Sequence, residues 1–488
     1  MAGKLERLAV ALVGSGVAGL VGYVGLRGLR VLPAVAALLA VLLAAGGGLW
    51  LARRLPATLD GLRQRRPWLS AAWLLLGLVA VGQTARQAAF MLDPSQAQYS
   101  LLPGDEWTTE HCCLTAYAES ARLAQGGEPN VYRPELYLDR RLTSFTVDLY
   151  HYPPPFLLFP LAAQAATGGG FLNVRALWFG VSALALLLAL GALAYRLEPA
   201  ARLRAIAVAP VIWCSLPVQL GLQMSNFQVL VVAMSVLAVA ALPRRAALGG
   251  ALLAVSAVSK IFPGILGLYL LARRRWREVA WTAGFAILFC ALALAVLGPA
   301  PFEAFVTYEL PRLSSGEAFA RPFSRPFAVA RNMAPFGIPL KLGWLGVPGM
   351  SLETGRLVSM GYGLAVLALA LWSARRPPRS TEEAVGVWLA LLSLGTLASP
   401  FAPANYVLVS LVWLVCVDRR IGRPWVVAAV WMLTSLPLLL PRDGSFLVEV
   451  LAFLPAQLLA LGVPALVLYR AGAASEPTRT PAATPART

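Results

Sequence analysis

The sequence predicts an all-α integral membrane protein folded as one bundle of transmembrane helices. Its 488 residues are 58% hydrophobic and only 13% charged, whereas soluble chains average about 45–50% apolar and about 25% charged residues. Apolar runs recur along almost the whole chain, and short arginine-rich segments separate them. Because so much apolar surface cannot be buried in water, the sequence excludes a cytosolic enzyme, a secreted domain and a disordered chain.

The apolar runs are the candidate membrane spans. A helix crosses the hydrocarbon core with about 20 apolar residues, and since several runs are shorter, we expect about 11 to 14 spans. We divide the chain into an N-terminal transmembrane hairpin with a cytoplasmic turn (1–67), the main transmembrane domain (68–470) and a disordered cytoplasmic tail rich in Ala, Thr and Pro (471–488). In chain order the apolar runs are 8–26, 31–51, 68–89, 171–195, 204–221, 227–242, 246–259, 261–272, 279–297, 355–372, 384–397, 405–417, 425–440 and 446–469.

Charge sets the expected orientation. The formal net charge is +18, but no long basic face or aromatic stacking motif accompanies it, so nucleic acid is not an expected partner. Cytoplasmic loops of membrane proteins carry the arginine excess, held against anionic lipids. The arginine bias is typical of a high-GC bacterial genome, so we expect a multi-pass protein of the bacterial inner (plasma) membrane. The arginine-rich turns all fall on one cytoplasmic side if 85–153 lies outside and 154–166 does not span, because it either dips into the bilayer and returns or lies along the interface. These turns are 53–66, 196–204, 244–245, 273–277, 375–379 and 419–423.

Two segments are too long to be simple connectors: the first outer loop (85–153) and the second outer loop (299–349). Loops beyond about 12 to 15 residues are usually functional or disordered. The first has too many Tyr, Leu and Trp for disorder, and it carries nine acidic residues, five arginines and both histidines of the chain. The second is rich in Pro, Phe and Arg, which favours short helices on the membrane surface. We expect the chemistry to lie between the two loops.

Five short motifs occur in order between residues 68 and 420. They are 115–132 (a Tyr-containing helix, a Gly-rich turn and Tyr), 150–156 (Tyr and three prolines), 221–226 (a turn ending in Asn), 259–263 (Lys followed by Pro) and 399–406 (Ser-Pro leading to Tyr). Together they resemble GT-C membrane glycosyltransferases, specifically the polyprenyl-phosphate-mannose-dependent mannosyltransferases of glycosyltransferase family 87. Two positions depart from the family pattern: Glu110 to Cys113 replace a common Asp, and Ala404 and Asn405 replace paired histidines.

The resemblance implies a GT-C-like bundle. It also implies the transfer of a sugar, expected to be mannose, from a polyprenyl-phosphate donor to a lipid or glycan acceptor on the periplasmic or extracellular side. It implies no organic cofactor. Such a reaction needs a carboxylate base within hydrogen-bond reach of the acceptor hydroxyl. Asp105 is our first choice, with Glu110 and Glu106 as rivals; the alternative reading is that all three are solvated loop acids.

Cations must hold the phosphate as its charge develops. Lys260 is the only lysine inside an apolar run, and an ammonium buried there costs several kcal/mol unless it is paired. It is therefore a candidate phosphate ligand, with snorkelling to the interface as the equal alternative. Arg321, Arg325 and Arg331 of the second outer loop could add bidentate phosphate contacts, or they could be rim charges facing lipid headgroups.

Polar and aromatic residues of the motifs are candidates for lining the substrate site. For the tyrosines the alternative is an aromatic belt, and for the amides it is helix capping. His111 and His151 could in principle join Glu110 or Asp148 at a metal. We expect no metal, because two histidines forty residues apart lack a tight ligand spacing. Cys112 and Cys113 form either a vicinal disulfide or two unpaired thiols. The candidate lining residues are His111, Tyr117, Tyr150, His151, Tyr152, Gln223, Asn226 and Asn405.

The main rival function is a transporter or flippase that moves a lipid-linked sugar without chemistry. Transporters tend to show internal repeats and charged residues near the bilayer centre. This sequence has no convincing repeat, and its charges lie mostly at the ends of the apolar runs. A third hypothesis is a degenerate family member that acts as a scaffold. Single substitutions of the candidate carboxylates distinguish an enzyme from both alternatives.

Overall fold

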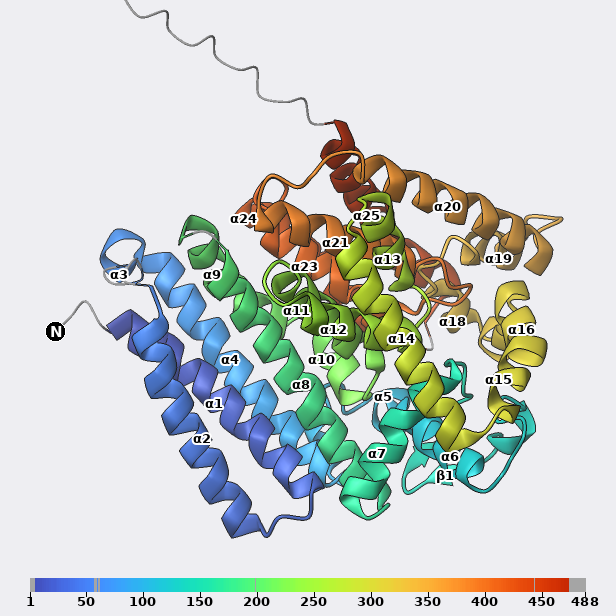
Figure 1. Ribbon diagram of the computed structural model, residues 1–488, viewed down its shortest axis with the longest axis horizontal. Helices are drawn as coiled ribbons and strands as arrows, with labels where there is room; N and C mark the ends of the chain where they lie inside the picture. The colour runs from blue at the N-terminus through green and yellow to red at the C-terminus, as the bar shows by residue number, and fades with distance from the viewer. Residues whose placement is uncertain (1–4, 57–58, 60–61, 198, 443, 474–488) are drawn as a thin grey trace, which may run out of the picture.

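Long apolar helices dominate the computed structural model, which describes residues 5–56, 59, 62–197, 199–442 and 444–473 (Figure 1). Most of the predicted tail, residues 474–488, lies outside the described residues. Strands in the described part are limited to one antiparallel hairpin, β1 Arg141–Leu142 with β2 Phe145–Thr146. The prediction of an all-α membrane protein is confirmed.

Seven helices are long and apolar enough to cross a membrane, or eight if the bent pair α9 Pro199–Trp213 and α10 Leu216–Gln223 is one span. The members of that pair meet at an angle of 58°. A helix rises 1.5 Å per residue, so only these elements reach across about 30 Å of hydrocarbon. The seven are α1 Leu5–Gly28, α2 Pro33–Arg54, α4 Pro67–Leu92, α8 Phe171–Arg196, α14 Trp276–Leu297, α20 Leu352–Ser373 and α25 Phe446–Ala473.

The remaining predicted spans are helices too, but they are short. This explains the difference between the 7 or 8 long helices and the larger number expected from apolar runs. Nearly every residue of α11 is buried, so this helix is apolar because it lies in the protein core. The short helices are α3 Leu62–Arg65, α11 Phe227–Ala241, α12 Ala246–Ser259, α13 Gly264–Ala272, α21 Thr381–Thr396, α22 Ala404–Val407, α23 Val409–Val417, α24 Pro424–Ser435 and η8 Leu436–Leu439.

The first outer loop folds into short elements between α4 and α8, and a further ten-residue helix, α7 Leu158–Thr167, precedes α8. Ten residues reach about 15 Å, half of the hydrocarbon thickness, so α7 does not span the bilayer; this agrees with the predicted dip. The other elements of this region are η3 Ala97–Tyr99, α5 Glu106–Glu110, α6 Leu114–Gln125, η4 Pro134–Leu136 and η5 Pro154–Leu157.

The second outer loop is a chain of short helices at the same end of the molecule (Figure 1). One of them, η6 Phe305–Glu309, is a π-helix. Such single turns occur often at functional sites. The others are α15 Ala300–Ala304, α16 Leu310–Ser315, η7 Glu317–Phe319, α17 Ala320–Phe323, α18 Pro326–Ala330 and α19 Gly337–Trp344.

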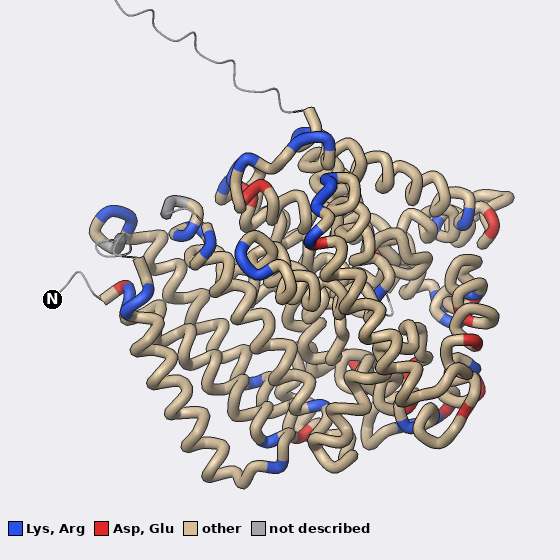
Figure 2. Tube along the Cα trace, viewed as in Figure 1, with Lys and Arg blue, Asp and Glu red and all other residues tan. Residues whose placement is uncertain are grey.

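Charge is distributed unevenly over the bundle. Figure 2 shows most of the arginine-rich turns in the upper left and upper middle, and most of the acidic residues at the lower right. At the lower end a buried arginine of α8, Arg175, donates from Nη1 to the carbonyl oxygens of Phe90 (2.8 Å) and Met91 (3.2 Å) in α4. The C-terminus of α4 and the N-terminus of α8 therefore lie together, as the predicted orientation requires.

Lipid must cover much of the outer surface. In α2 and α14 only 11% of the best apolar window is buried within the protein, and large side chains such as Leu42, Trp50 and Ile287 are exposed. An apolar patch of this extent is not stable in water. The chain is a multi-pass membrane protein.

Candidate active site

The N-terminus of α11 meets the first outer loop in the middle of the molecule. Asn226 caps this helix: its Oδ1 accepts a hydrogen bond from the Gln228 N–H at 2.9 Å. The Asn226 Nδ2 donates to Cys113 Sγ at 3.2 Å, and the Cys113 N–H donates to the Met224 carbonyl at 2.8 Å. Capping by Asn satisfies a free helix N–H group, and here the capping residue also holds the loop in place.

Lys260 lies at the same point, immediately after α12. Its Nζ donates to Gln228 Oε1 at 3.1 Å and lies 5.4 Å from the centre of the Tyr152 ring. Among the described residues it has no carboxylate partner. An ammonium held only by an amide and an aromatic face retains unsatisfied positive charge. The N-terminus of α11 adds a positive dipole end beside it, so this position suits an anion.

His111 connects two other groups of the site. Its ring stacks on Trp107 with a centroid distance of 4.2 Å, its Nδ1 lies 3.3 Å from Asp148 Oδ1, and its Nε2 lies 3.4 Å from Cys113 Sγ. A bridge between the backbones of His111 and Thr146 holds the two halves of the loop together. Burial alone would lower the pKa of His111, but Asp148 and Cys113 outweigh it and raise the pKa well above 6.5.

The same three residues are the ones that could hold a metal ion. Ligand atoms of His111, Cys113 and Asp148 lie within 4.8 Å of one another, and the thiols of Cys112 and Cys113 are free. However, Asp148 faces Nδ1 of the imidazole and Cys113 faces Nε2. Since an ion binds one ring nitrogen, a tetrahedral site would require these side chains to move, and the observed geometry fits a hydrogen-bonded chain better.

Tyrosines form the floor of the site. The hydroxyls of Tyr117 and Tyr152 lie 2.6 Å apart, and the Tyr152 ring stacks on Phe156 at 4.5 Å. Burial raises the pKa of both phenols, so they remain protonated and can donate hydrogen bonds. Tyr150 is also buried, but its hydroxyl donates to the Pro153 carbonyl at 3.3 Å. It therefore supports the backbone next to Tyr152.

Asp105 lies at a neighbouring cavity of about 640 Å³. Its Oδ1 and Oδ2 accept hydrogen bonds from Arg442 Nε at 3.1 and 2.9 Å, and Oδ2 also accepts one from Thr108. The Arg442 guanidinium lies 3.8 Å from the Trp107 ring centre, and the opposite neighbour of that ring is His111. The cavity is therefore one aromatic ring away from the histidine. Glu106 is exposed and lines the same cavity.

Arginines neutralise several carboxylates of the first outer loop. Of the loop's other acids, Asp93 bonds within its own turn, while Glu135 and Asp139 are exposed. Asp148 is paired with a histidine instead. The arginine pairs are Asp105 with Arg442, Glu110 with Arg141, Glu119 with Arg122 and Arg140, and Glu128 with Arg133.

The three arginines proposed for phosphate have different surroundings. Arg331 is buried and pairs with Glu449 of α25, with 3.0 Å between Nε and Oε2; it also donates to the Leu440 carbonyl at 2.9 Å. Arg321 and Arg325 are exposed, and within the described part of the chain their side chains have no partner. The structure thus gives Arg331 a structural contact and leaves the other two free to bind.

Three further predicted residues connect the site with neighbouring segments. Gln223 accepts from the Leu101 N–H at 2.8 Å and donates to Ser100 Oγ at 2.9 Å, which fastens the first outer loop to α10. Asn405 Nδ2 lies 3.4 Å from Met224 Sδ. His151 Nδ1 lies 2.7 Å from Glu309 Oε1 of the second outer loop.

The predicted residues thus fall into two groups. One group gathers around the N-terminus of α11: His111, Tyr117, Tyr152, Asn226, Lys260 and Asn405. The other predicted residues do not gather at one point; they lie at the Asp105 cavity, behind the tyrosines, at the surface or in contacts between loops. They are Asp105, Glu106, Glu110, Tyr150, His151, Gln223, Arg321, Arg325 and Arg331.

Sequence reasoning missed several residues of this region, chiefly Asp148, Glu309 and Arg442. Nothing in the spacing of Asp148 distinguishes it from the loop's other acids. A signal for Arg442 did exist: it is an arginine near the outer end of a late apolar run, where the positive-inside rule disfavours one.

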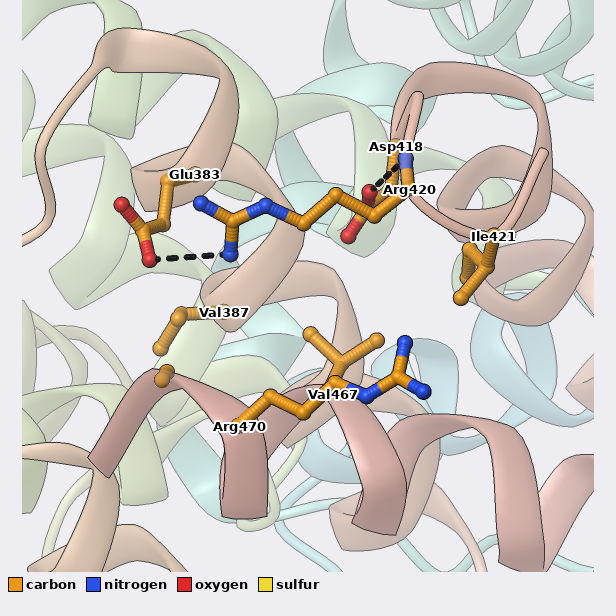
Figure 3. A pocket seen from close by; sticks show the side chains of 8 residues that line it. Glu383, Val387, Asp418, Arg420, Ile421, Val467 and Arg470 are labelled. Atoms are coloured by element: carbon orange, nitrogen blue, oxygen red, sulfur yellow. Dashed lines mark hydrogen bonds and ion pairs between the residues drawn. The ribbon is translucent and has the colours of Figure 1, made fainter. Parts of the chain in front are cut away.

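A second cavity lies at the opposite, arginine-rich end (Figure 3). Its volume is about 10 Å³, room for about one water molecule. Glu383 Oε1 accepts from Arg420 Nη1 at 3.2 Å, and Asp418 Oδ1 accepts from the Arg420 N–H at 2.8 Å. These bonds hold Arg420 against the two acidic residues that line this cavity.

Comparison with known proteins is consistent with this site. The profile of glycosyltransferase family 87 matches residues 150–400, a range that includes Lys260 and begins just after Asp148. A polyprenol-phosphate-mannose-dependent alpha-(1-2)-phosphatidylinositol pentamannoside mannosyltransferase from Mycolicibacterium smegmatis is 28% identical over 173 residues, which cover 34% of this chain and 36% of the relative. The match therefore spans about a third of that relative's length. No solved structure matches the chain.

Proposed function

Because the chain belongs to glycosyltransferase family 87, we propose that it transfers mannose from a polyprenyl-phosphate donor to a hydroxyl of a lipid or glycan acceptor. The name of the mycobacterial relative gives that protein a polyprenol-phosphate-mannose donor and a phosphatidylinositol-mannoside acceptor. We propose the same class of donor for this chain, and we propose that its acceptor is a glycolipid. The partners are then the donor, the acceptor and membrane lipids.

The observation that carries this proposal is the surroundings of Lys260. Its ammonium is held by Gln228 and the Tyr152 ring, beside the positive end of α11. In glycosyl transfer the bond from the sugar to the phosphate breaks, and charge develops on the phosphate oxygen. A fixed cation at that oxygen stabilises the transition state more than the ground state. We propose Lys260 as the main phosphate ligand, with Arg321 and Arg325 receiving the phosphate at the rim.

The sequence offers Asp105, Glu106 and Glu110 as candidates for the base, and their positions bear on where the acceptor binds. Asp105 and Glu106 line the 640 Å³ cavity, which is large enough for a sugar of the acceptor. Trp107 separates this cavity from His111, and aromatic faces commonly pack against sugar rings. We propose that the acceptor occupies this cavity and presents its hydroxyl toward the α11 end.

We propose that the reaction takes place on the periplasmic or extracellular side of a bacterial inner membrane. Support comes from the arginine-rich turns, which lie at the end of the bundle away from the two outer loops (Figure 2) and which the positive-inside rule assigns to the cytoplasm. A lipid-anchored donor suits such a site, because soluble nucleotide sugars are confined to the cytoplasm.

The test uses the full chain in lipid nanodiscs with radiolabelled polyprenyl-phosphate mannose and phosphatidylinositol mannosides. Transfer of label to the glycolipid supports the enzyme. A parallel assay in sealed vesicles follows movement of the labelled donor between leaflets. Movement without transfer would support the transporter alternative and overturn the proposal.

A further inference from the structure

We propose that Asp148 is the catalytic base of this site and that His111 positions its carboxylate. This inference rests on the proposed glycosyl transfer and adds to it a residue outside the set that the sequence singles out. Its carrying observation is geometric: Asp148 is held by an imidazole instead of a guanidinium, and that imidazole contacts, through Cys113, the residue that caps the helix carrying the Lys260 partner.

The pairing of the loop acids distinguishes Asp148 from Asp105 and Glu110, while the third rival, Glu106, is exposed and lines the Asp105 cavity. Asp105 accepts from Arg442 with both oxygens, and Glu110 is paired with Arg141. Arginine contacts occupy lone pairs that a base needs to accept a proton: one Nε–H of Arg442 is shared by both oxygens of Asp105, and Arg141 contacts Oε2 of Glu110. Asp148 keeps 30% of its side chain exposed, with Oδ1 directed at His111. It is therefore anchored at one oxygen and accessible to a substrate hydroxyl.

The backbone places Asp148 firmly. Its N–H donates to Thr115 Oγ1 at 3.1 Å, and the same hydroxyl donates to the carbonyls of Cys112 (2.8 Å) and Thr146 (3.2 Å). Thr115 thus joins α6 to the strand that leads to Asp148. Catalytic groups must be held in one geometry to act on a bound substrate, and this network supplies such a support.

A short chain of contacts connects Asp148 with Lys260. From Asp148 it runs through His111 and Cys113 to Asn226, which caps the helix that carries Gln228, the Lys260 partner. Tyr152 gives a second connection. Its ring lies under the Lys260 ammonium, and after burial and Cys113, the charge of Asp148 is a further cause that raises the pKa of Tyr152.

This geometry defines a balanced step. The acceptor hydroxyl gives its proton to the free oxygen of Asp148 as the acceptor oxygen forms a bond to the anomeric carbon. The bond between that carbon and the phosphate oxygen breaks, and its electron pair leaves on the polyprenyl phosphate, whose negative charge Lys260 faces. Asp148 then releases its proton to water. The His111 imidazole, whose Nδ1 lies 3.3 Å from Asp148 Oδ1, holds the carboxylate in position before the transfer.

The decisive experiment compares Asp148→Asn with wild type in the nanodisc transfer assay. Asn keeps the size of Asp and an oxygen that can accept from His111, so the fold is retained, and a thermal unfolding curve checks this. We expect the transfer rate to fall about 100-fold or more, since base catalysis contributes about 10²–10⁴, with donor binding within threefold of wild type. The matched control is Asp139→Asn, an exposed acid of the same loop, which is expected to keep its rate.

Two variants test the positioning role. His111→Gln retains an N–H that can donate to Asp148, whereas His111→Ala does not. We expect His111→Ala to lower the transfer rate about tenfold without changing donor KM, and His111→Gln to restore part of the loss. Equal losses of rate and donor binding in both variants would mean a merely structural role and would overturn this assignment.

The outcomes separate this inference from the proposed function. If both the wild type and Asp148→Asn transfer the sugar, the assignment of Asp148 as the base is overturned, but the proposed glycosyltransferase function stands. Donor binding without transfer in wild type overturns the proposed function and this inference together. A third outcome would be one zinc ion per chain that a chelator removes together with the activity. This result would assign His111, Cys113 and Asp148 to a metal site and would overturn the proposal that Asp148 is the base.

Discussion

The imidazole of His151 lies 2.7 Å from the fully buried carboxylate of Glu309, across 158 positions of sequence. This contact joins the segment that carries Asp148 and Tyr152 to the π-helix of the second outer loop. Arg312 lies on the other side of Glu309 at 3.2 Å. The two outer loops therefore share a buried charge, and neither loop can move away without exposing or unpairing it.

We predict that His151→Ala lowers the free energy of unfolding by about 1.5–3 kcal/mol, the range for a hydrogen bond to a charged group. Glu309→Ala is expected to cost more, because it leaves His151 and Arg312 without their shared partner. Thermal unfolding of the two single variants and the double variant in detergent gives their coupling energy. Strictly additive effects would contradict a direct interaction.

Lys260→Met is predicted to lower kcat/KM for the polyprenyl-phosphate donor by about 10²–10³, the effect of removing one charge-stabilising donor from an active site. Lys260→Arg should recover part of this loss, since it restores the charge with a different geometry. The control is Arg244→Ala in an exposed arginine-rich turn. Wild-type kinetics in Lys260→Met would remove this residue from phosphate binding.

Removing one partner of the Arg331–Glu449 pair should be strongly destabilising. The two side chains are only 7% and 3% exposed, so Glu449→Ala leaves an unpaired buried guanidinium and is expected to cost about 3–5 kcal/mol. The exposed pair of Arg356 and Glu353, 3.8 Å apart, is a matched control expected to contribute no more than about 1 kcal/mol. Chemical unfolding measures both, and equal losses would contradict the burial argument.

The raised pKa of His111 predicts a pH-dependent contribution to stability. The folded protein binds this proton more tightly than the unfolded chain, whose histidine titrates near 6.5. The contribution is therefore fully present below that pH and is lost as the pH rises through the folded value. We expect the difference in Tm between wild type and His111→Gln to be largest at acidic pH and to shrink on the alkaline side. A constant difference would show that the two states have the same His111 pKa.

The proposed orientation predicts the labelling of single cysteines in intact cells. In a background without the partly exposed Cys290, Gln125→Cys of the first outer loop should react with a membrane-impermeant maleimide. Arg244→Cys should react only after the membrane is opened. The remaining native cysteines are buried. The reverse pattern would put the acidic loop in the cytoplasm and contradict the membrane side proposed for the reaction.

Sequence reasoning succeeded where each segment could be judged by itself. Apolar runs such as 171–195 and 279–297 correspond closely to α8 and α14, because the cost of leaving apolar side chains in water depends on local composition. The family resemblance, drawn from short motifs, is confirmed. The number of long helices was harder to predict. Runs such as 227–242 are apolar because they are buried inside the protein, and in sequence they cannot be distinguished from runs that are apolar because they face lipid.

The candidate site could be predicted only in part. Lys260 could be predicted because burying a lone lysine in an apolar run costs free energy wherever the run lies in the fold. Asn226 could be predicted because it belongs to one of the short family motifs. The partners of the charged groups were not accessible, because Asp105 meets Arg442 across 337 positions of sequence. Pairing decides which carboxylate can act as a base, and nothing in the spacing of the nine loop acids reveals it.

By itself, then, the sequence determined the class of this protein, its family and the end of the bundle that collects its acidic loops, because composition and charge act segment by segment. Only the tertiary structure decided which carboxylates are neutralised by arginine and which one is paired with the imidazole that contacts the α11 cap through Cys113. Electrostatic interactions act through a few ångströms of space, and that proximity arises from packing between segments that are far apart in the chain.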